Sequence, residues 1–358
     1  MEILSTFLVL ILFAISLFNF VSARSISPRD FRIESSVAIL IPMRNEEINA
    51  RDVVASSLAQ ANVSELRVMA LDDFSNDQTG LILSGIRDDR FTTLSARVLP
   101  SGWLGKNFAL HTLAAESDAE YLVFLDADVR LDSRAISSAI SLMNEKGWDY
   151  ICPYPKQIAS GLLAKTVQPL LQWSWFATLP LRLVENSKRT STVVANGQFF
   201  IVKNSAYKNS GGHEAIKGEV LDDLELARSL RKSGSQGSVV DASAISTCEM
   251  YKSSGALLAG YSKSQWRAFG GSAGALVAIA LLFITSIYPF AALVDLQTWA
   301  ILSSIGLVLS RAMAAIKTRS VLITAPLHPI AISIWIYLIL RSLFLKRSGK
   351  LEWRGRTI

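Results

Sequence analysis

The sequence predicts an α/β domain built on a parallel sheet and flanked by membrane-spanning helices. Strand-like and helix-like segments alternate from residue 36 to about residue 250, which is the pattern of βαβ units. Apolar stretches of membrane-spanning length precede and follow that region, at 3–22 and from 271 onward. The composition fits such a mixed protein, because 50% of the 358 residues are hydrophobic, 18% are charged and the mean hydropathy is +0.33.

The N-terminal apolar stretch predicts an uncleaved transmembrane anchor over residues 1–23. A cleaved signal peptide is the alternative, because Val21-Ser22-Ala23 would serve as a cleavage site. Against it, the chain starts with Glu2 and no Lys or Arg, and the apolar run is longer than in a usual signal peptide. The positive-inside rule places the next domain in the cytoplasm of a multi-pass cell-membrane protein. The basic residues behind this expectation are Arg24, Arg29 and Arg32.

The central α/β domain, placed at 33–250, should contain at least four buried strands with helices between them. The predicted strands are Ser36–Pro42, Leu66–Leu71, Leu94–Leu99 and Tyr121–Leu125. The predicted helices cover roughly Ile48–Gln60, a segment that starts near Asp77 as a cap, and Gly105–Glu116. In open α/β sheets, ligands bind at the carboxyl ends of the strands, so the residues that follow each strand are the candidate site.

Asp126 and Asp128 follow the most apolar of these strands, one residue apart. Two carboxylates at a strand end form a hard, oxygen-rich site that suits Mg²⁺ or Mn²⁺ carrying a diphosphate. A simple turn is the alternative, since Asp often ends a strand.

Asp72 and Asp73 end a neighbouring strand in the same way. A carboxylate at this edge can accept hydrogen bonds from a uracil ring N–H or from ribose hydroxyls. The alternative is a solvated turn in which Asp77 caps the next helix.

Pro42, Arg44, Asn45 and Glu46 follow the first strand, so they belong to the same predicted edge. Arg44 can neutralise phosphate charge. Glu46, and Glu47 still more, are also explained as ordinary acids in the first turn of a helix.

Lys106 lies at a predicted helix start, just after Gly102 and Gly105. Free N–H groups at a helix N-terminus bind anions, and a lysine there adds a charge suited to phosphate. The spacing is not that of a Walker A loop, and a plain helix start is the alternative.

Asp222 and Asp223 lie at the start of a helix predicted to begin near Val220. A carboxylate that takes a proton from an acceptor hydroxyl must lie near the reacting carbon, and position alone supports that role only weakly.

Three further apolar segments follow a short interfacial helix predicted at 251–270. They make up the C-terminal transmembrane region at 271–345, and the segments are 271–294, 297–316 and 321–345. Pro326 and Pro329 suggest that the third is kinked or re-entrant. Three full crossings would place the basic tail, 346–358, outside, against the positive-inside rule, so two to three spans remain open. A basic tail beside a membrane indicates contact with anionic headgroups rather than nucleic acid.

Segment 160–185 contains Trp173, Trp175 and Phe176, so it is either an interfacial helix or a buried domain helix. The two cysteines, Cys152 and Cys248, match no metal spacing. Of the three histidines, His111 is expected to pack in a helix and His328 has no assigned role. His213 is either a hydrogen-bonded loop residue or a contact to acceptor or phosphate.

Taken together, these motifs resemble the inverting family 2 glycosyltransferases with a GT-A fold. The matching segments, in chain order, are Ile41-Pro42-x-Arg44-Asn45-Glu46, Asp72-Asp73, Gly105-Lys106-x-x-Ala109, Asp126-Ala127-Asp128 and Asp222-Asp223. Four more resemble the membrane-bound branch with hopanoid-associated and carotenoid (diaponeurosporenoate-type) enzymes. These are Gly102-Trp103-x-Gly105-Lys106, Asn196-Gly197-Gln198, Gly211-Gly212-His213 and Trp353-Arg354-Gly355-Arg356.

The resemblance implies a role for each motif. Asp72 or Asp73 would hold the base and ribose of a UDP-linked sugar, and Asp128 with Asp126 would bind the divalent cation. Asp223 would be the general base, and Lys106 would stabilise the departing diphosphate. Asp222 stands where the family often has Glu, and Gln265-Trp266-Arg267 departs from the motif of processive synthases.

The function implied is transfer of a sugar from a nucleotide-sugar to a lipid acceptor, such as an isoprenoid, carotenoid or hopanoid. A polyisoprenyl-phosphate glycosyltransferase is the first alternative. A non-catalytic membrane subunit on the same scaffold is the second.

Overall fold

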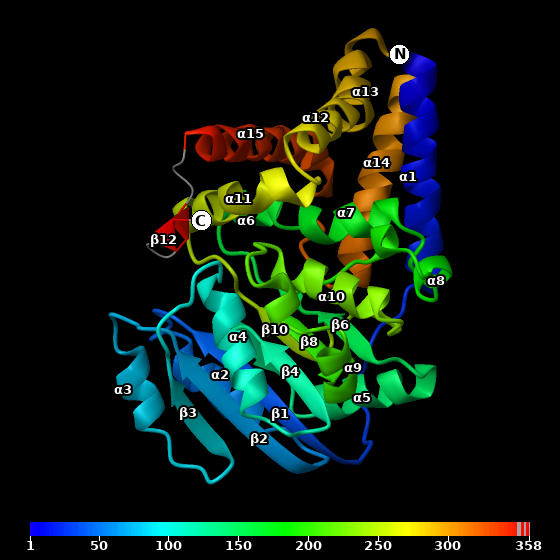
Figure 1. Cartoon of the computed structure of the whole chain (residues 1–358). Helices are drawn as coiled ribbons and strands as arrows, with labels where there is room; N and C mark the ends of the chain where they lie inside the picture. The colour runs from blue at the N-terminus through cyan, green and yellow to red at the C-terminus, as the bar shows by residue number, and fades with distance from the viewer. Residues whose placement is uncertain (349–351, 354–355, 358) are drawn as a thin grey trace. The chain divides into compact units, whose positions relative to one another are not determined.

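The computed structural model describes residues 1–348, 352–353 and 356–357 (Figure 1). The Trp353-Arg354-Gly355-Arg356 motif and most of the predicted basic tail lie outside the residues whose side chains are described. The chain divides into two compact units. The α/β unit comprises Arg24–Lys156 and Leu183–Cys248, and the helical unit comprises Met1–Ala23, Gln157–Arg182 and Glu249–Ile358.

The α/β unit is built on a seven-stranded sheet of order β3-β2-β1-β4-β8-β6-β9. Its strands are β1 (Ile33–Met43), β2 (Val63–Asp72), β3 (Phe91–Ser95), β4 (Tyr121–Leu125), β6 (Tyr150–Tyr154), β8 (Phe199–Lys203) and β9 (Gly237–Asp241). A second, smaller sheet pairs β5 (Val129–Leu131) with β10 (Ser246–Cys248), and β7 (Lys156–Gln157) belongs to it.

The prediction of a parallel sheet is correct for every strand of the large sheet except β8, which runs antiparallel to both β4 and β6. Because β8 runs the other way, Phe199 at its start pairs with Leu125 at the end of β4. The residues that precede β8 therefore reach the same edge of the sheet as the residues that follow β4. The sequence prediction of alternating strands and helices could not reveal this reversal.

The carboxyl ends of β1, β2 and β4 meet at one edge, as predicted. Met43 at the end of β1 is in register with Asp72 at the end of β2. Leu40 of β1 is in register with Phe124 of β4, so Asp126 follows at the same edge. All five residues of β4 are buried, which is why its sequence is continuously apolar.

The third strand was predicted too late in the chain. We expected Leu94–Leu99, whereas β3 covers Phe91–Ser95. As an edge strand, β3 pairs only with β2, and its pairing stops at Ser95 opposite Asp72, where β2 ends. Val98 then lies in a loop with 85% of its surface exposed, so the apolar pattern there does not mark a strand.

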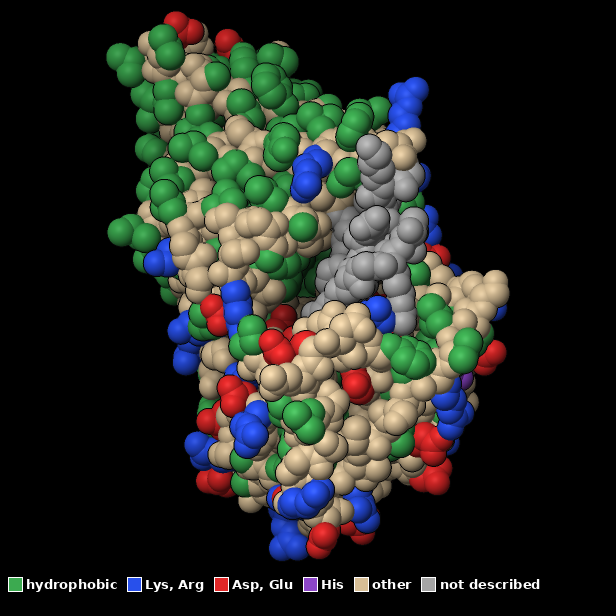
Figure 2. All heavy atoms as spheres, turned by 90° about the vertical axis from the view of Figure 1, so that its left-hand side faces the viewer, with side chains coloured by type: hydrophobic (Ala, Val, Ile, Leu, Met, Phe, Trp, Pro, Cys, Tyr) green, Lys and Arg blue, Asp and Glu red, His purple; other side chains and the backbone are tan. Residues whose placement is uncertain are grey.

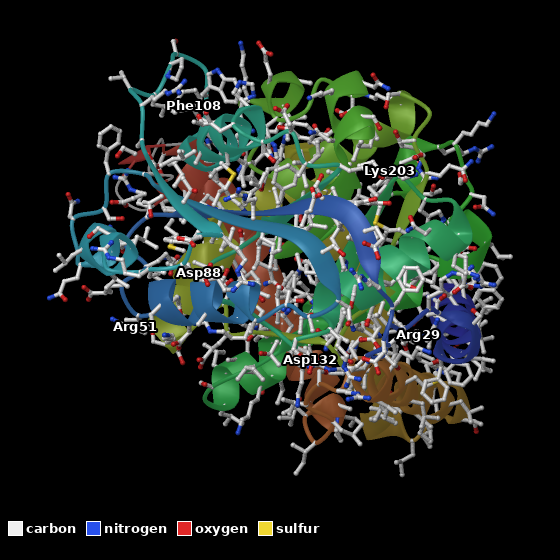
Figure 3. All side chains as sticks on the ribbon, turned by 90° about the horizontal axis from the view of Figure 1, so that it is seen from below. Arg29, Arg51, Asp88, Phe108, Asp132 and Lys203 are labelled. Carbon is white, nitrogen blue, oxygen red and sulfur yellow. The ribbon has the colours of Figure 1, made fainter. Side chains whose placement is uncertain are left out.

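Helices cover both faces of the sheet. Figure 3 shows this with Arg51 on α2 and Phe108 on α4, which lie on opposite sides of the strands. The helices of the unit are α2 (Ala50–Leu58), α3 (Thr79–Ser84), α4 (Gly105–Ala115), α5 (Ala135–Lys146), α9 (Asn204–Asn209) and α10 (Asp222–Lys232). Two short 3₁₀ turns are η1 (Thr190–Thr192) and η2 (Glu214–Ile216). The residue that immediately precedes α3 is Gln78, and Asp77 lies one residue earlier; its carboxylate accepts the N–H of Thr79, the first residue of the helix, at 2.9 Å.

The helical unit contains four helices that are long and apolar enough to cross a membrane. Its elements are α1 (Glu2–Ser22), α6 (Leu162–Val167), α7 (Leu170–Thr178), α11 (Ser254–Ala268), α12 (Ser272–Ser286), α13 (Tyr288–Ala291), η3 (Ala292–Asp295), α14 (Thr298–Lys317), η4 (Ala325–Leu327) and α15 (His328–Arg347). The helix α8 (Leu181–Val184) lies at the boundary of the units, and β11 (Glu352–Trp353) pairs with β12 (Arg356–Thr357). Figure 2 shows hydrophobic side chains spread over this unit and few charged ones among them.

The segment 160–185 packs inside the helical unit. Helix α7 contacts α1 and α14, and Trp173 and Phe176 are buried there. The Asn19 side chain of α1 donates hydrogen bonds to the carbonyls of Phe176 and Leu179, both at 2.7 Å. This burial agrees with the alternative of a buried helix, but residues 160–182 belong to the helical unit and not to the α/β domain.

Pro326 and Pro329 do not kink the last apolar helix. They occupy the first turns of η4 and α15, where a proline lacks no helical hydrogen bond. Helix α15 then continues to Arg347 without another proline.

Candidate functional site

Lys106 lies at the centre of a cluster of carboxylates at the ligand-binding edge of the α/β unit. Its Nζ is 2.8 Å from Oδ1 of Asp126 and 3.3 Å from Oδ2 of Asp222. Burial alone would lower the pKa of Lys106, but the Asp126 and Asp222 carboxylates outweigh it and raise that pKa above its usual value. Lys106 therefore stays a cation and holds two chain segments, after β4 and at the start of α10, in one place.

The position of Lys106 follows from the local sequence. Helix α4 begins at Gly105, so Lys106 is in its first turn, as predicted. The next residue, Asn107, is buried and donates its amide hydrogens to the carbonyls of Ile216 and Glu219, both at 3.0 Å. These bonds fix the loop before α10 against the start of α4, which brings Asp222 within reach of Lys106.

Asp223 is held by two backbone N–H groups. Gly197 donates to its Oδ2 at 2.8 Å and Leu224 donates to its Oδ1 at 2.8 Å. Burial raises the pKa of Asp223 to about 6; the Asp222 carboxylate adds to the rise, and Lys106 partly offsets it. A carboxylate with such a pKa is ionised at neutral pH and basic enough to accept a proton.

Gly197 was not among the predicted site residues, although its motif was noted. A Cβ at this position would lie 3.1 Å from Cβ of Asp223 and 3.5 Å from Nζ of Lys106. The glycine leaves room for both side chains. Gly197 precedes β8, so knowing that β8 is antiparallel would have been needed to place it at this edge.

Asp126 and Asp128 follow β4 as predicted, and their carboxylates are strongly perturbed. Burial, then the Asp126 charge and the Glu46 charge, raise the pKa of Asp128 to about 7. Burial also raises the pKa of Asp126, against the opposing effect of Lys106. Oδ1 of Asp128 is buried without a hydrogen-bond partner. A buried acceptor left in this way is expected to bind a ligand.

The residues around Asp128 fit a divalent cation that is shared with a substrate. Among the described residues, no group of three or more His, Cys, Asp or Glu side chains is arranged to hold a metal alone. Mg²⁺ and Mn²⁺ sites in phosphate-transferring proteins commonly use one or two carboxylates and complete the shell with substrate oxygens and water. Asp126 and Asp128 satisfy the protein part of such a site.

The residues after β1 and β2 form a second group at the same edge. Nη1 of Arg44 donates to the Asp73 carbonyl at 2.9 Å and lies 3.6 Å from its Oδ2. The Asp72 carboxylate accepts the Ser75 N–H at 3.2 Å, so it shapes its own turn. Asn45 adopts a left-handed backbone, with φ of 53°, and its side chain accepts the Asn76 N–H at 2.8 Å. These bonds tie the two loops together.

Glu46 and Pro42 occupy the positions expected for them. Pro42 is half-buried in β1, one residue before its end. Glu46 is also half-buried, its carboxylate accepts the Asn49 side-chain N–H at 2.8 Å, and its charge raises the pKa of Asp126 and Asp128. Glu46 thus links the first loop to the carboxylates after β4.

The histidines and cysteines have packing roles in the α/β unit. His213 is buried, its Nδ1 is 2.9 Å from the Tyr207 hydroxyl and its ring packs on Phe124. Burial lowers the pKa of His213 to about 3, which agrees with the hydrogen-bonded alternative. His111 packs on Trp103, as predicted. Both cysteines are free and buried.

The comparisons with known proteins agree with this fold. Residues 38–211 match the family model described as glycosyl transferase family 2. A curated relative, 4,4'-diaponeurosporenoate glycosyltransferase of Staphylococcus haemolyticus (strain JCSC1435), is 25% identical over 215 residues. That match covers 57% of this chain and 54% of the relative, so the chain spans about half the length of the relative it matches.

A solved structure shows the same fold. The mannosyltransferase PcManGT of Pyrobaculum calidifontis, in complex with GDP-Man and Mn²⁺, superposes with a TM-score of 0.55 at 14% identity. The superposition covers 94% of this chain and 98% of that one. The fold of the α/β unit is of the GT-A type. More specifically, residues 38–211 are similar to family 2 glycosyltransferases, and the curated relative that the chain resembles is a carotenoid-type glycosyltransferase.

Proposed function

We propose that this chain is a membrane-bound, inverting glycosyltransferase that moves one sugar from a nucleotide-sugar to a lipid acceptor. The observation that carries the proposal is the cluster in which Lys106 lies between Asp126 and Asp222, with Asp223 beside it. It combines a cation for a leaving diphosphate with a carboxylate for an incoming hydroxyl. The family match supports the reaction class.

In this proposal the donor lies along the edge formed by β1, β2 and β4. Asp73 or Asp72, with Arg44 and the Pro42-to-Glu46 loop, binds the nucleoside, for which a UDP-linked donor is the expectation. Asp126 and Asp128 would hold Mg²⁺ or Mn²⁺, which when bound neutralises diphosphate charge. The Mn²⁺ and GDP-Man in the Pyrobaculum protein support a divalent cation and a nucleotide-sugar of some kind.

Transfer then takes place in one in-line step. The acceptor oxygen forms a bond to the anomeric carbon while the bond from that carbon to the diphosphate oxygen breaks, so the configuration inverts. Asp223 takes the proton of the acceptor hydroxyl. Lys106 stabilises the negative charge that develops on the nucleoside diphosphate. Asp222 keeps Lys106 in place through the 3.3 Å ion pair.

The buried base favours a hydroxyl acceptor over an ionised one. A phosphate or carboxylate acceptor has no proton to lose at neutral pH, whereas a hydroxyl does. The Staphylococcus relative is named for diaponeurosporenoate, which is a carboxylate. Its name therefore supports the broad lipid class of the proposed acceptor but not the choice of a hydroxyl group. A polyisoprenyl phosphate is the alternative acceptor on the same donor site.

The membrane part of the proposal rests on the four apolar helices. They would anchor the chain as a multi-pass protein of the cell membrane, with the α/β unit in the cytoplasm. Arg24, Arg29 and Arg32 after α1 support that orientation.

A donor and acceptor screen tests the proposal. The full chain in detergent or nanodiscs would be given UDP- or GDP-linked sugars, Mn²⁺ and a native lipid extract, and products would be identified by mass. We expect a neutral lipid whose mass has increased by one sugar. A product that retains a phosphate would support the polyisoprenyl-phosphate alternative. No transfer and no donor hydrolysis with any sugar would indicate a non-catalytic subunit.

A further inference from the structure

The last apolar helix, α15, differs from the other three in its direction and in its neighbours. Within the helical unit, α1 and α14 run side by side, whereas α15 runs across them (Figure 1). Helix α15 packs along α11 and meets α14 only weakly, although the two follow each other in the chain. Consecutive spanning helices joined by a short connection normally pack as an antiparallel pair. Helices α14 and α15 do not form that pair.

The contacts between α15 and α11 are specific and run along α15 from Trp335 to Lys346. The Trp335 ring lies 5.1 Å from the Tyr261 ring. The Arg341 guanidinium donates to the Leu258 carbonyl at 3.0 Å and to the Ser262 hydroxyl at 2.6 Å. Nearer the end of α15, the Ser342 hydroxyl accepts a hydrogen bond from the backbone N–H of Trp266 at 3.1 Å. Nζ of Lys346 lies 3.6 Å from the centre of the Trp266 ring.

Helix α11 therefore sets the depth at which α15 can lie. It has 15 residues, and its sequence includes Lys263, Gln265 and Arg267, so it is not among the four helices apolar enough to span a membrane. Each cationic residue at the bilayer centre would cost about 2.5–3.5 kcal/mol. A polar helix of this kind lies at the membrane surface, and a helix packed along it lies there too.

The exposed face of α15 also suits a position at the membrane surface. One stripe at helical spacing is exposed, and the opposite stripe is buried in the unit. The large apolar side chains of the exposed stripe are Ile330 (53% exposed), Tyr337 (55%), Leu340 (48%) and Phe344 (68%). Lys346 and Arg347 follow at its end. An apolar outer face followed by basic residues fits a leaflet of acyl chains and anionic headgroups.

The distribution of charged residues along the chain independently indicates which of these helices cross the membrane. The turn between α12 and α14 carries Asp295 and no Lys or Arg, whereas Lys317 ends α14 and Arg319 follows it. The Ser5 hydroxyl of α1 donates to the Ile284 carbonyl of α12 at 2.7 Å, so the chain start and that turn are on one side. Crossings by α1, α12–α13 and α14 then satisfy the positive-inside rule. A crossing by α15 would put five basic residues on the wrong side.

We infer that α15 does not cross the bilayer but lies in its cytoplasmic interface, apolar face toward the acyl chains. The protein then has three spanning helices, and its basic C-terminal segment stays on the side of the α/β unit. The inference rests on the membrane association proposed above but not on the reaction. It removes the conflict between three C-terminal apolar segments and the charge of the tail.

Cysteine labelling with a membrane-impermeant maleimide tests the inference in the full chain. The two native cysteines are buried and should react little. Ser348→Cys reports the end of α15, Leu296→Cys reports the turn before α14, and Glu65→Cys, at an exposed position of β2, reports the α/β unit. The variants are labelled in sealed right-side-out and inverted vesicles. Ser348→Cys should react in the same vesicle orientation as Glu65→Cys, and Leu296→Cys should react in the other orientation.

Labelling of Ser348→Cys together with Leu296→Cys would overturn the inference. If Glu65→Cys and Leu296→Cys labelled on one side, the proposed membrane topology itself would be wrong, and the inference with it. Spin labels at Ile330, Tyr337 and Phe344 give a second measurement, should the Ser348 variant not fold. Residues 330 and 344 are about 21 Å apart along a helix. Similar shallow depths would support an in-plane helix, and depths that differ by about 20 Å would refute it.

Discussion

Replacing Gly197 with Ala should slow the proposed reaction without removing any catalytic group. The new Cβ would lie 3.1 Å from Cβ of Asp223 and 3.5 Å from Cγ of Asp223. Carbon atoms in ordinary contact are about 3.5–4.0 Å apart, so Asp223 must move by roughly 0.5 Å. Since a displacement of about 1 Å can cost about a hundredfold in rate, half of it should cost about tenfold in kcat.

The Gly197→Ala assay separates an effect on the position of the Asp223 side chain from an effect on the stability of the protein. Steady-state transfer by the full chain gives kcat and the donor KM, and a thermal melt gives Tm. We expect kcat to fall about tenfold with the donor KM little changed. The matched control is Gly85→Ala, where the new Cβ would lie 3.4 Å and 3.6 Å from two carbonyls outside the site. A Gly197→Ala protein with wild-type kcat would refute the claim that the approach to β8 positions Asp223.

Three further results are expected. Lys106→Met should lower kcat/KM for the donor by about 10²–10³-fold, as loss of one preorganised charge commonly does, and Lys106→Arg should recover part of this loss. Steady-state rates measure both effects, and a Lys106→Met protein with wild-type activity would contradict the role of Lys106 in stabilising the leaving diphosphate. With a nucleoside diphosphate present, saturating Mn²⁺ at about 100 times its Kd should stabilise the wild type by about 2.7 kcal/mol, and Asp128→Asn should lose most of that thermal shift; an equal shift in both proteins would place the cation elsewhere. Because burial raises the pKa of Asp223 to about 6, kcat should rise about tenfold per pH unit below pH 6 and level off above it; a flat profile would exclude Asp223 as a rate-determining base.

Much of the α/β unit could be predicted because local sequence decides it. The buried strand Tyr121–Leu125 and the helix starting at Gly105 are where the apolar pattern and the glycine signal placed them. The edge of carboxylates followed from strands β1, β2 and β4 being parallel. The strand and the helix start depend on residues a few positions apart.

What could not be predicted depends on pairing across long stretches of chain. The antiparallel direction of β8 is set by its contacts with β4 and β6, and without it Gly197 cannot be placed beside Asp223. The position of β3 was missed because its pairing with β2, not its apolar content, decides where it ends. Likewise, α15 has the composition of a spanning helix. The charge of the sequence left the number of spans open, and the packing of α15 on α11 is what indicates another position for this helix.

The measurement that tests the central claim most directly is the transfer rate of Asp223→Asn with donor binding measured on the same protein. Asn keeps the size of the side chain and an oxygen for the Gly197 N–H, but it cannot take a proton. The predicted result is a loss of about 10²–10⁴-fold in kcat with the donor Kd little changed. An Asp223→Asn protein that transfers sugar at the wild-type rate would contradict the proposed base and, with it, the preference for a hydroxyl acceptor.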